Sequence, residues 1–273
     1  MSRKPSLNSA FIVEPGSKMR LADIDPGATL GFDKSDAART TRRGLERLTD
    51  LQTRLWAEGR QRLLIVLQGI DSAGKGGTIA HVMSAFNPQG CRVKGFKVPT
   101  EDELAHDYLW RVHPHVPRNG EISIFDRSHY EQVLVVRVHD LERRERWERH
   151  YDQINAFEQL LVDEGTTILK FFLLISKDEQ RARLQDRFDD PKKHWKFRLN
   201  DLEERKRWDD YIAAYEDMLD RCSTAAAPWY VIPADRNWFR NLAVTEIVAE
   251  TLEAMNPQFP PSPDPLPDHL EVV

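Results

Sequence analysis

The chain has 273 residues, of which 40% are hydrophobic, 9% aromatic and 30% charged. This length suits one large α/β domain, and no apolar run approaches the roughly 18 residues that a membrane span requires. The formal net charge of −5 argues against a general nucleic-acid-binding protein, so a polyanionic ligand would need a local cluster of basic side chains.

Two cysteines, Cys91 and Cys222, are too few for a disulfide framework or a four-thiolate metal site. Both are expected to be buried as small hydrophobic residues. The N-terminus lacks the apolar stretch of a secretory signal, which predicts a cytoplasmic protein.

The first and last segments differ from the centre in composition. Residues 1–35 are rich in proline and glycine and show no sustained hydrophobic period, which predicts an extended N-terminal arm. Residues 257–273 form a proline-rich tail, with six prolines between Pro257 and Pro267, a composition that favours an extended conformation. The folded domain and its functional residues are therefore expected within residues 36–256.

Five short β-rich runs lie in this central part, at residues 63–67, 91–98, 122–125, 167–175 and 229–232. Several are continuous apolar blocks, which is typical of strands covered on both faces. Helical patterns separate them, and in residues 141–162, for example, apolar side chains recur every three to four positions. The alternation predicts an α/β fold with a parallel five-stranded sheet covered by helices on both faces.

A glycine-rich segment follows the first predicted strand and precedes a predicted helix. In it, Gly69, Gly74 and Lys75 match the pattern G-x-x-x-x-G-K. Glycines allow backbone N–H groups to face inward, the helix N-terminus adds partial positive charge, and the lysine reaches the outer phosphates. The predicted phosphate-binding residues of this loop are Gly69, Ser72, Ala73, Gly74, Lys75, Gly76, Gly77 and Thr78. The alternative is a glycine-rich turn without a chemical role.

The loop departs from the usual pattern where a hydroxyl would hold Mg²⁺, because Gly76 occupies that place and Thr78 comes two positions later. Asp71 in the loop and Asp126 at the end of the third predicted strand are the expected metal ligands, since Mg²⁺ prefers a few carboxylates together with water and phosphate oxygens. Mn²⁺ is an alternative ion, and a helix N-cap is the alternative role for Asp126. Arg127 either clamps a phosphate or pairs with a neighbouring acid.

Residues 181–207 hold ten basic and six acidic side chains, the local excess of positive charge that a polyanion requires. Pro191 interrupts a helical pattern there, which predicts a helix, a basic loop and a second helix, the form of a lid over phosphates. Arg183 and Arg187 lie four positions apart on the first helix and are expected to reach a charged chain from one face. Most of the lysines in this segment are expected to be solvated.

Other candidate residues lie outside the loop and the lid. Four basic residues would extend a phosphate track: Lys94 and Lys97 on the second predicted strand, and Arg42 and Arg43. The histidines nearest the predicted site are expected to have hydrogen-bonded structural roles rather than to form a phosphohistidine: His113, His115 and His129.

Seven stretches of the chain match one family pattern: LQGIDSAGKGGTI, FNPQG, DYLWRVH, FDRSHYEQVLVVRVH, DPKKHWKF, WYVIPADRNWFRNL and MNPQFP. Through them the chain closely resembles the polyphosphate kinase 2 family, over roughly residues 16–260. The resemblance implies a P-loop kinase fold with a helical lid, a requirement for Mg²⁺, and transfer of a terminal phosphoryl group between inorganic polyphosphate and a nucleotide. It also implies a homo-oligomer, either a dimer or a tetramer.

The resemblance carries over to individual residues of this chain. The catalytic positions that it implies are Asp71, Lys75, Asp126, Arg127, Arg183 and Arg187. Glu131 is similar to the residue of the class III subgroup, which uses AMP as well as ADP, whereas ADP-specific relatives tend to carry Asn there. The implied nucleotides are therefore AMP, ADP and ATP, with guanine nucleotides as further candidates.

The expected mechanism is in-line transfer between polyphosphate and a nucleotide phosphate, without a covalent enzyme intermediate. Catalysis would then consist of positioning and charge neutralisation. Two alternatives remain open from the sequence. One is an ATP-dependent kinase for a small metabolite, and the other is a polyphosphate-binding protein without catalytic activity.

Overall fold

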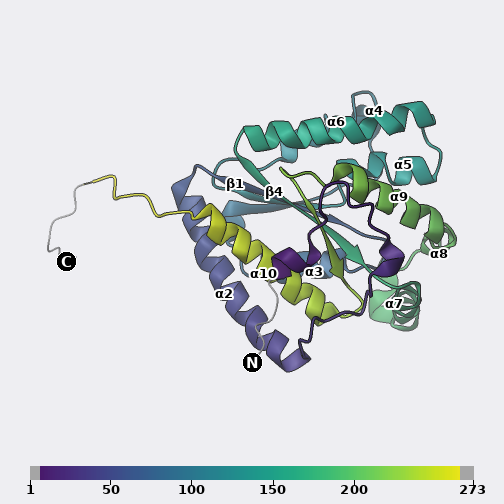
Figure 1. Cartoon of the computed structure of the whole chain (residues 1–273), viewed down its shortest axis with the longest axis horizontal. Coiled ribbons are helices and arrows are strands. Elements are labelled where there is room, and N and C mark those ends of the chain that lie inside the picture. Colours follow the sequence, from purple (N-terminus) through teal and green to yellow (C-terminus); the bar gives the residue numbers. More distant parts are fainter. Residues whose placement is uncertain (1–6, 265–273) are drawn as a thin grey trace.

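The centre of the molecule is a parallel sheet of five strands in the order β2-β3-β1-β4-β5, seen in a computed structural model that describes residues 7–264 (Figure 1). The strands are β1 (Arg62–Gln68), β2 (Cys91–Gly95), β3 (Ile122–Asp126), β4 (Thr166–Leu174) and β5 (Trp229–Pro233). All five predicted strands are present. The second ends at Gly95, three residues before its predicted end, because the chain leaves the sheet after Phe96 N donates to Asp126 O.

Alternate strand residues enter two separate cores, one on each face of the sheet. Leu63 and Ile65 of β1 pack in the core under α2 (Lys34–Glu58), α3 (Lys75–Met83) and α10 (Asn237–Met255). Leu64 and Val66 pack in the other core, with α6 (Arg144–Asp163) and α9 (Trp208–Cys222). Burial on both faces explains why the strands are continuous apolar runs. The predicted fold class is confirmed.

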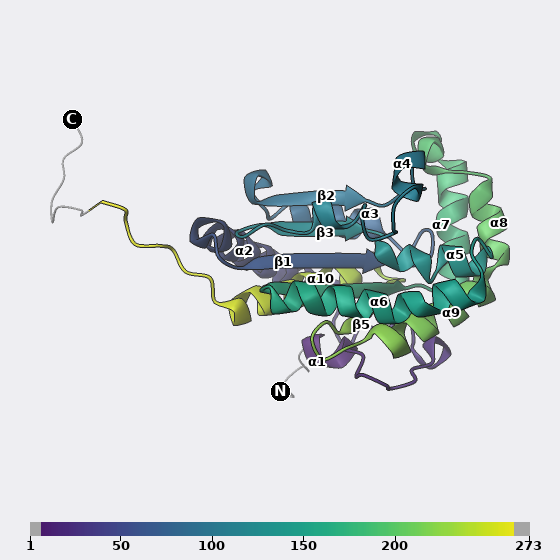
Figure 2. The same cartoon turned by 90° about the horizontal axis from the view of Figure 1, so that it is seen from above.

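The lid segment lies at the carboxyl ends of the strands, where α7 and α8 cover one end of the sheet (Figure 2). It consists of α7 (Lys177–Asp189), the 3₁₀ helix η5 (Pro191–Lys196) and α8 (Asn200–Lys206), so the predicted break at Pro191 is confirmed. The remaining short helices are α1 (Leu7–Phe11), α4 (Glu101–Leu104) and α5 (Val135–Val138), with the 3₁₀ helices η1 (Leu21–Asp23), η2 (Pro88–Gly90), η3 (His113–His115) and η4 (His129–Gln132). Among residues 7–264, no helix combines the length and apolar character that crossing a membrane requires.

The described part of the predicted N-terminal arm is not extended throughout. It contains α1, whose Leu7 and Phe11 are buried against the core under α10. Ile12 then forms an antiparallel bridge with Tyr230, and the N–H of Val13 donates to Trp229 O at 2.8 Å, so this segment covers the free edge of β5. Residues 1–6 of the predicted arm and 265–273 of the predicted tail lie outside the described residues.

Helices α2 and α10 pack closely at Gly44. A Cβ atom at this position would lie 2.7 Å from Thr245 Cγ2 and 2.6 Å from Glu246 Oε1. Thr245 is completely buried on α10 and has no room to withdraw. Glycine in the middle of a helix ordinarily costs stability, and here the missing side chain is what allows the two helices to approach.

We predict that Gly44→Val lowers the free energy of unfolding by about 1–3 kcal/mol, because the added methyl groups overpack the helix contact. Urea denaturation measures the change. Gly95→Ala is the control, since a Cβ there meets nothing within 4 Å and should not lower the free energy of unfolding. Equal stability of the Gly44→Val variant and the unsubstituted protein would contradict this account of the contact.

Candidate active site

The glycine-rich segment connects β1 to α3 and curves at the carboxyl end of the sheet. Gly69 has φ 157° and lies against β4, so that a Cβ atom there would come within 2.9 Å of Leu173 O. Gly74 has φ 100°, the left-handed conformation that begins α3. Both positions require glycine, one for close packing and the other for backbone conformation. The strand, loop and helix predicted from the pattern are all present.

Arg183 of α7 binds the backbone of this loop from the side that faces the end of β5, which we call the back of the loop. Its Nη1 donates to Ser72 O at 2.9 Å and Ala73 O at 3.1 Å, and its Nε donates to Glu179 Oε1 at 2.8 Å. Its Nη2 donates to two carbonyls after β5, those of Ala234 at 2.6 Å and Asp235 at 3.0 Å. All five N–H groups therefore have acceptors in the protein.

This arrangement orients the peptide between Ala73 and Gly74. Its carbonyl is bound by Arg183, and the N–H of a trans peptide points away from its carbonyl. The Gly74 N–H is therefore directed away from the guanidinium, toward the side of the loop that a phosphate would occupy. The sequence placed Arg183 among the phosphate ligands; that role stays a prediction, and its partners here are loop carbonyls.

A second arginine behind the loop, Arg240 on α10, was missed by the sequence reasoning. Its guanidinium is buried, with Nη1 2.7 Å from Asn237 Oδ1 and Nη2 2.9 Å from Asn241 Oδ1. A Cβ atom at Gly74 would lie 1.9 Å from Arg240 Nη1. Burial and the charge of Arg183 lower the pKa of Arg240 to about 10. Among residues 7–264 no carboxylate forms an ion pair with Arg240, so positive charge lies directly behind the loop.

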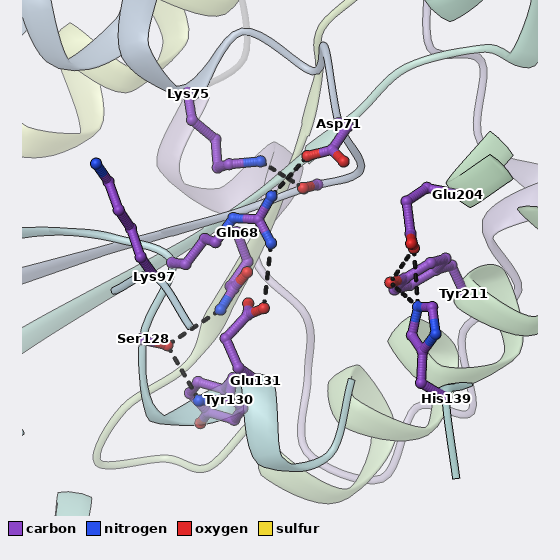
Figure 3. Close-up of polar contacts among 12 residues, drawn as sticks. Gln68, Asp71, Lys75, Lys97, Ser128, Tyr130, Glu131, His139, Glu204 and Tyr211 are labelled. Atoms are coloured by element: carbon purple, nitrogen blue, oxygen red, sulfur yellow. Dashed lines mark hydrogen bonds and ion pairs between the residues drawn. The ribbon is translucent and has the colours of Figure 1, made fainter. Parts of the chain in front are cut away.

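Lys75 is the first residue of α3 and folds back over the loop (Figure 3). Its buried Nζ donates to Gly69 O at 2.6 Å. Burial and the charge of Arg127 lower the pKa of Lys75, and the carboxylates of Asp71 and Asp126 partly oppose this effect. Lys75 thus marks the point where the loop that carries Asp71 meets the carboxyl end of the sheet.

The carboxyl end of β3 brings Asp126 and Arg127 to this point. Asp126 pairs in register with Leu67 of the neighbouring β1. Arg127 has φ 63°, and this left-handed turn carries its side chain across to the loop, where Nη2 lies 2.6 Å from Asp71 Oδ1. Its Nη1 lies 3.3 Å from Glu131 Oε2. Glu131, more strongly than Asp71, raises the pKa of Arg127, although burial opposes the rise.

Of the two roles expected for Arg127, the structure shows the pairing with acids. The guanidinium bridges two carboxylates, one from the loop and one from η4. The phosphate clamp stays a prediction, and it would require Arg127 to share its donors between these acids and a phosphate.

The donor set suits a magnesium ion that is held by phosphate as much as by protein. Thr78 cannot supply a ligand from its present position, because its buried hydroxyl donates to Gly74 O at 3.2 Å. Within residues 7–264 no three His, Cys, Asp or Glu side chains form a metal-binding group. The Asp126 carboxylate has no hydrogen bond or ion pair to another described residue. Asp71 and Asp126 thus supply two carboxylates, which fits an ion that keeps water and phosphate oxygens in its shell.

A pocket opens between this cluster and the lid. Gln180 on α7 forms one contact across it, donating from Nε2 to Asp71 O at 3.0 Å. On the far side, Glu204 of α8 accepts from Tyr211 OH at 2.8 Å and lies 2.9 Å from His139 Nε2 (Figure 3). The lining residues are Gly69, Ile70, Asp71, Arg127, Glu131, Leu134, Val135, Gln180, Glu204, Trp208, Tyr211 and Tyr215.

The other predicted basic residues make no hydrogen bond or ion pair with Asp71, Lys75, Asp126 or Arg127 among the described residues. Arg187 on α7 is 3.8 Å from Asp201 Oδ2 of α8, and Lys94 on β2 lies over the Phe96 ring at 5.7 Å. Lys97 is exposed beyond β2. Arg42 and Arg43 are exposed on α2. Contacts with phosphate stay predictions for all five residues.

Burial and contacts bear on two further expectations. Cys91 and Cys222 are both free and buried, as predicted. Of the three histidines, His129 has the hydrogen-bonded structural role expected, with Nε2 3.2 Å from Glu158 Oε1. His113 and His115 lie in edge contacts with Phe157 and Phe96.

We predict that Arg183→Lys weakens the binding of inorganic triphosphate at least about tenfold, because three ammonium donors cannot replace five guanidinium donors on the loop carbonyls. Isothermal titration calorimetry measures the dissociation constant. Arg181→Lys, an exposed change two residues away on the same helix, is the matched control and should bind like the unsubstituted protein. Equal affinities for the two variants would show that the Arg183 contacts do not shape the loop.

Comparison with known proteins places the chain in a family. Residues 31–260 match the model of the family described as Polyphosphate kinase 2 (PPK2). An AMP/ADP-polyphosphate phosphotransferase from Meiothermus ruber is 53% identical over 255 residues, which are 92% of this chain and 94% of that protein. An ADP-polyphosphate phosphotransferase from Rhodopseudomonas palustris is 46% identical over 228 residues, 79% of each chain.

The fold agrees over the same extent. The crystal structure of Polyphosphate Kinase 2 from Arthrobacter aurescens TC1 is similar with a TM-score of 0.93 at 42% identity, covering 97% of this chain and 95% of that one. Because sequence and fold match over most of its length, this chain belongs to the polyphosphate kinase 2 family.

Proposed function

We propose that this protein transfers phosphoryl groups between inorganic polyphosphate and nucleotides, converting AMP to ADP and ADP to ATP. The observation that carries the proposal is the meeting of Lys75, Asp71, Asp126 and Arg127 at the carboxyl ends of β1 and β3, beside a pocket under a basic lid. The 53% identity to an AMP/ADP-polyphosphate phosphotransferase supports the choice of substrates. No observation favours a metabolite kinase or a binding protein without catalytic activity.

Transfer proceeds in line in this proposal. An oxygen of the nucleotide's terminal phosphate attacks the end phosphorus of polyphosphate, and the bond to the next phosphate breaks, leaving its electron pair on the shortened chain. The attacking oxygen is already anionic, so the reaction needs no strong base. The protein's task is to align two polyanions and to neutralise the charge spread over the transferred group.

The residues of the site divide this task. Lys75 supplies an ammonium over the loop, and the Gly74 N–H supplies a backbone donor. Arg127 supplies a guanidinium between the loop and Glu131. In this proposal Arg183 shapes the loop through its carbonyls, Arg187 lies further out on the lid helix α7, and the contact of both with polyphosphate stays a prediction.

Mg²⁺, or Mn²⁺ in its place, would be held by Asp71 and Asp126 and would screen the charge of the phosphate oxygens. The glycine at position 76 and the Thr78 hydroxyl, which donates to Gly74 O, support this assignment, since neither position supplies the hydroxyl that usually holds the ion.

The acceptor nucleotide lies in the pocket under the lid in this proposal, with Glu131 at the boundary between the phosphates and the pocket. The resemblance of Glu131 to the class III subgroup supports acceptance of AMP as well as ADP, and guanine nucleotides are further acceptors to be tested. We expect a cytoplasmic homo-oligomer, either a dimer or a tetramer, and the free thiols of Cys91 and Cys222 suit that reducing compartment.

The proposed function makes a prediction about the substrates and the metal. The purified protein, supplied with polyphosphate and Mg²⁺, is expected to phosphorylate both AMP and ADP, and chelation with EDTA should stop the reaction. Chromatographic separation of nucleotides after incubation with AMP, ADP, GMP and GDP measures the products. Phosphorylation of ADP without AMP would refute the role given to Glu131, and no transfer to any nucleotide would refute the function.

The second prediction concerns the loop lysine. Lys75→Ala should lower the rate of ATP formation from ADP and polyphosphate by about 10²–10³-fold, the usual effect of removing one donor that stabilises developing charge. Initial rates at saturating substrate measure the change. Arg144→Ala removes an exposed cation of α6 and should leave the rate unaltered. An unaltered rate in Lys75→Ala would remove the loop from the mechanism.

A further inference from the structure

A buried ion pair lies beneath the short turn that carries Glu131. Lys170 of β4 and Glu158 of α6 are 0% and 1% exposed, and Lys170 Nζ lies 2.5 Å from Glu158 Oε2. The same Nζ donates to Tyr130 OH at 2.8 Å and to Cys222 O at 2.7 Å. All three ammonium donors are thus used, and they connect β4 to α6, α9 and η4.

The second oxygen of Glu158 binds the turn directly. Glu158 Oε1 accepts from Tyr130 OH at 2.8 Å and lies 3.2 Å from His129 Nε2. Tyr130 OH therefore accepts from Lys170 and donates to Glu158. His129 and Tyr130 are the first two residues of η4, so its beginning is attached to the buried pair.

The next residue of the same turn faces the active site. Glu131 binds Arg127, which in turn binds Asp71 of the phosphate loop. Figure 3 shows Tyr130 and Glu131 leaving the turn in different directions. Ser128 fixes the start of the turn, since its hydroxyl accepts from the Tyr130 N–H at 3.2 Å and from Gln68 Nε2 at 3.1 Å. A 3₁₀ turn of four residues is too short to hold its own position.

A charged pair is an unusual way to stabilise this core. Apolar side chains of similar volume are often as stabilising as a buried ion pair, but they lack directional bonds. Burial opposes ionisation of Glu158, yet Lys170 and His129 outweigh it and lower the pKa of the carboxyl group, which favours the carboxylate. What the pair provides is a set of directed bonds that end on His129 and Tyr130.

We propose that Lys170 and Glu158 are positioning residues that set where η4 holds Glu131 and Arg127 over the phosphate loop, and thereby set the preference between AMP and ADP. This inference rests on the proposed function. In this proposal neither Lys170 nor Glu158 touches substrate, and both act through Tyr130 and His129.

Tyr130→Phe tests the proposal, because it removes the hydroxyl between Lys170 and Glu158 and keeps the ring and Glu131. We expect kcat/KM for AMP to fall about tenfold, the scale of one lost hydrogen bond to a charged group, and kcat/KM for ADP to change less than about twofold. Glu158→Gln keeps the size of the side chain and removes its charge, and it should shift the AMP-to-ADP ratio in the same direction.

Tyr151→Phe is the matched control. Tyr151 is also completely buried and its hydroxyl accepts from a cation, Arg137 Nη1 at 3.1 Å, but it makes no hydrogen bond to η4. In Tyr151→Phe the ratio of kcat/KM for AMP to kcat/KM for ADP should equal that of the unsubstituted protein. The thermal midpoint of this variant should be similar to that of Tyr130→Phe.

An unchanged ratio in both Tyr130→Phe and Glu158→Gln, with an active unsubstituted protein, would overturn the positioning role alone. An equal shift in Tyr151→Phe would overturn it as well, because loss of core stability would then explain the effect. An unsubstituted protein that transfers phosphate to neither AMP nor ADP would refute the proposed function, and this inference would fall with it.

Discussion

The site depends on one cation that holds two carboxylates together. Asp71 and Glu131 come from different elements, and without Arg127 between them their charges would repel each other and any phosphate nearby. Arg127 reaches both because the chain turns left-handed at the end of β3, a conformation that costs energy for a residue with a side chain. The neighbouring strand fixes that turn, since the Arg127 N–H donates to Leu67 O at 3.0 Å. Backbone geometry and charge balance are therefore linked at a single residue.

Positive charge is arranged around the loop on more than one side. Lys75 lies over the loop, while Arg183 and Arg240 lie behind it. This explains how a chain with a net charge of −5 can attract a polyanion. The cations behind the loop also orient its peptides, so they need not touch a phosphate to favour its binding.

The strands and the loop could be predicted because their signals are local. An apolar run marks a strand covered on both faces, and the spacing of Gly69, Gly74 and Lys75 marks the loop wherever a strand precedes it. The carbonyl partners of Arg183 could not be predicted, since they lie on the loop and after β5, more than 50 residues away in either direction. Lys170 was predicted only as part of a strand, because nothing near it in the sequence shows that Glu158 of α6 forms an ion pair with it on the face of the sheet.

The two helices of the lid, α7 and α8, differ in what they bind. Along its first turns α7 is bound to the phosphate loop, by Gln180 at Asp71 O and by Arg183 at Ser72 O and Ala73 O. Beyond Pro191, α8 meets the pocket through Glu204, which lies 2.9 Å from His139 Nε2, and meets the start of α7 through Arg205, which donates to Lys177 O and Gln180 Oε1. Polar contacts beside a pocket can be replaced by water or phosphate oxygens at little cost, whereas the Ser72 and Ala73 carbonyls of the loop accept from the buried side of the protein, from Arg183 and, at Ala73 O, also from Arg240. A polyanion that enters under the lid would therefore compete with the Glu204 contacts of α8 at the pocket and leave the loop and the first turns of α7 in place.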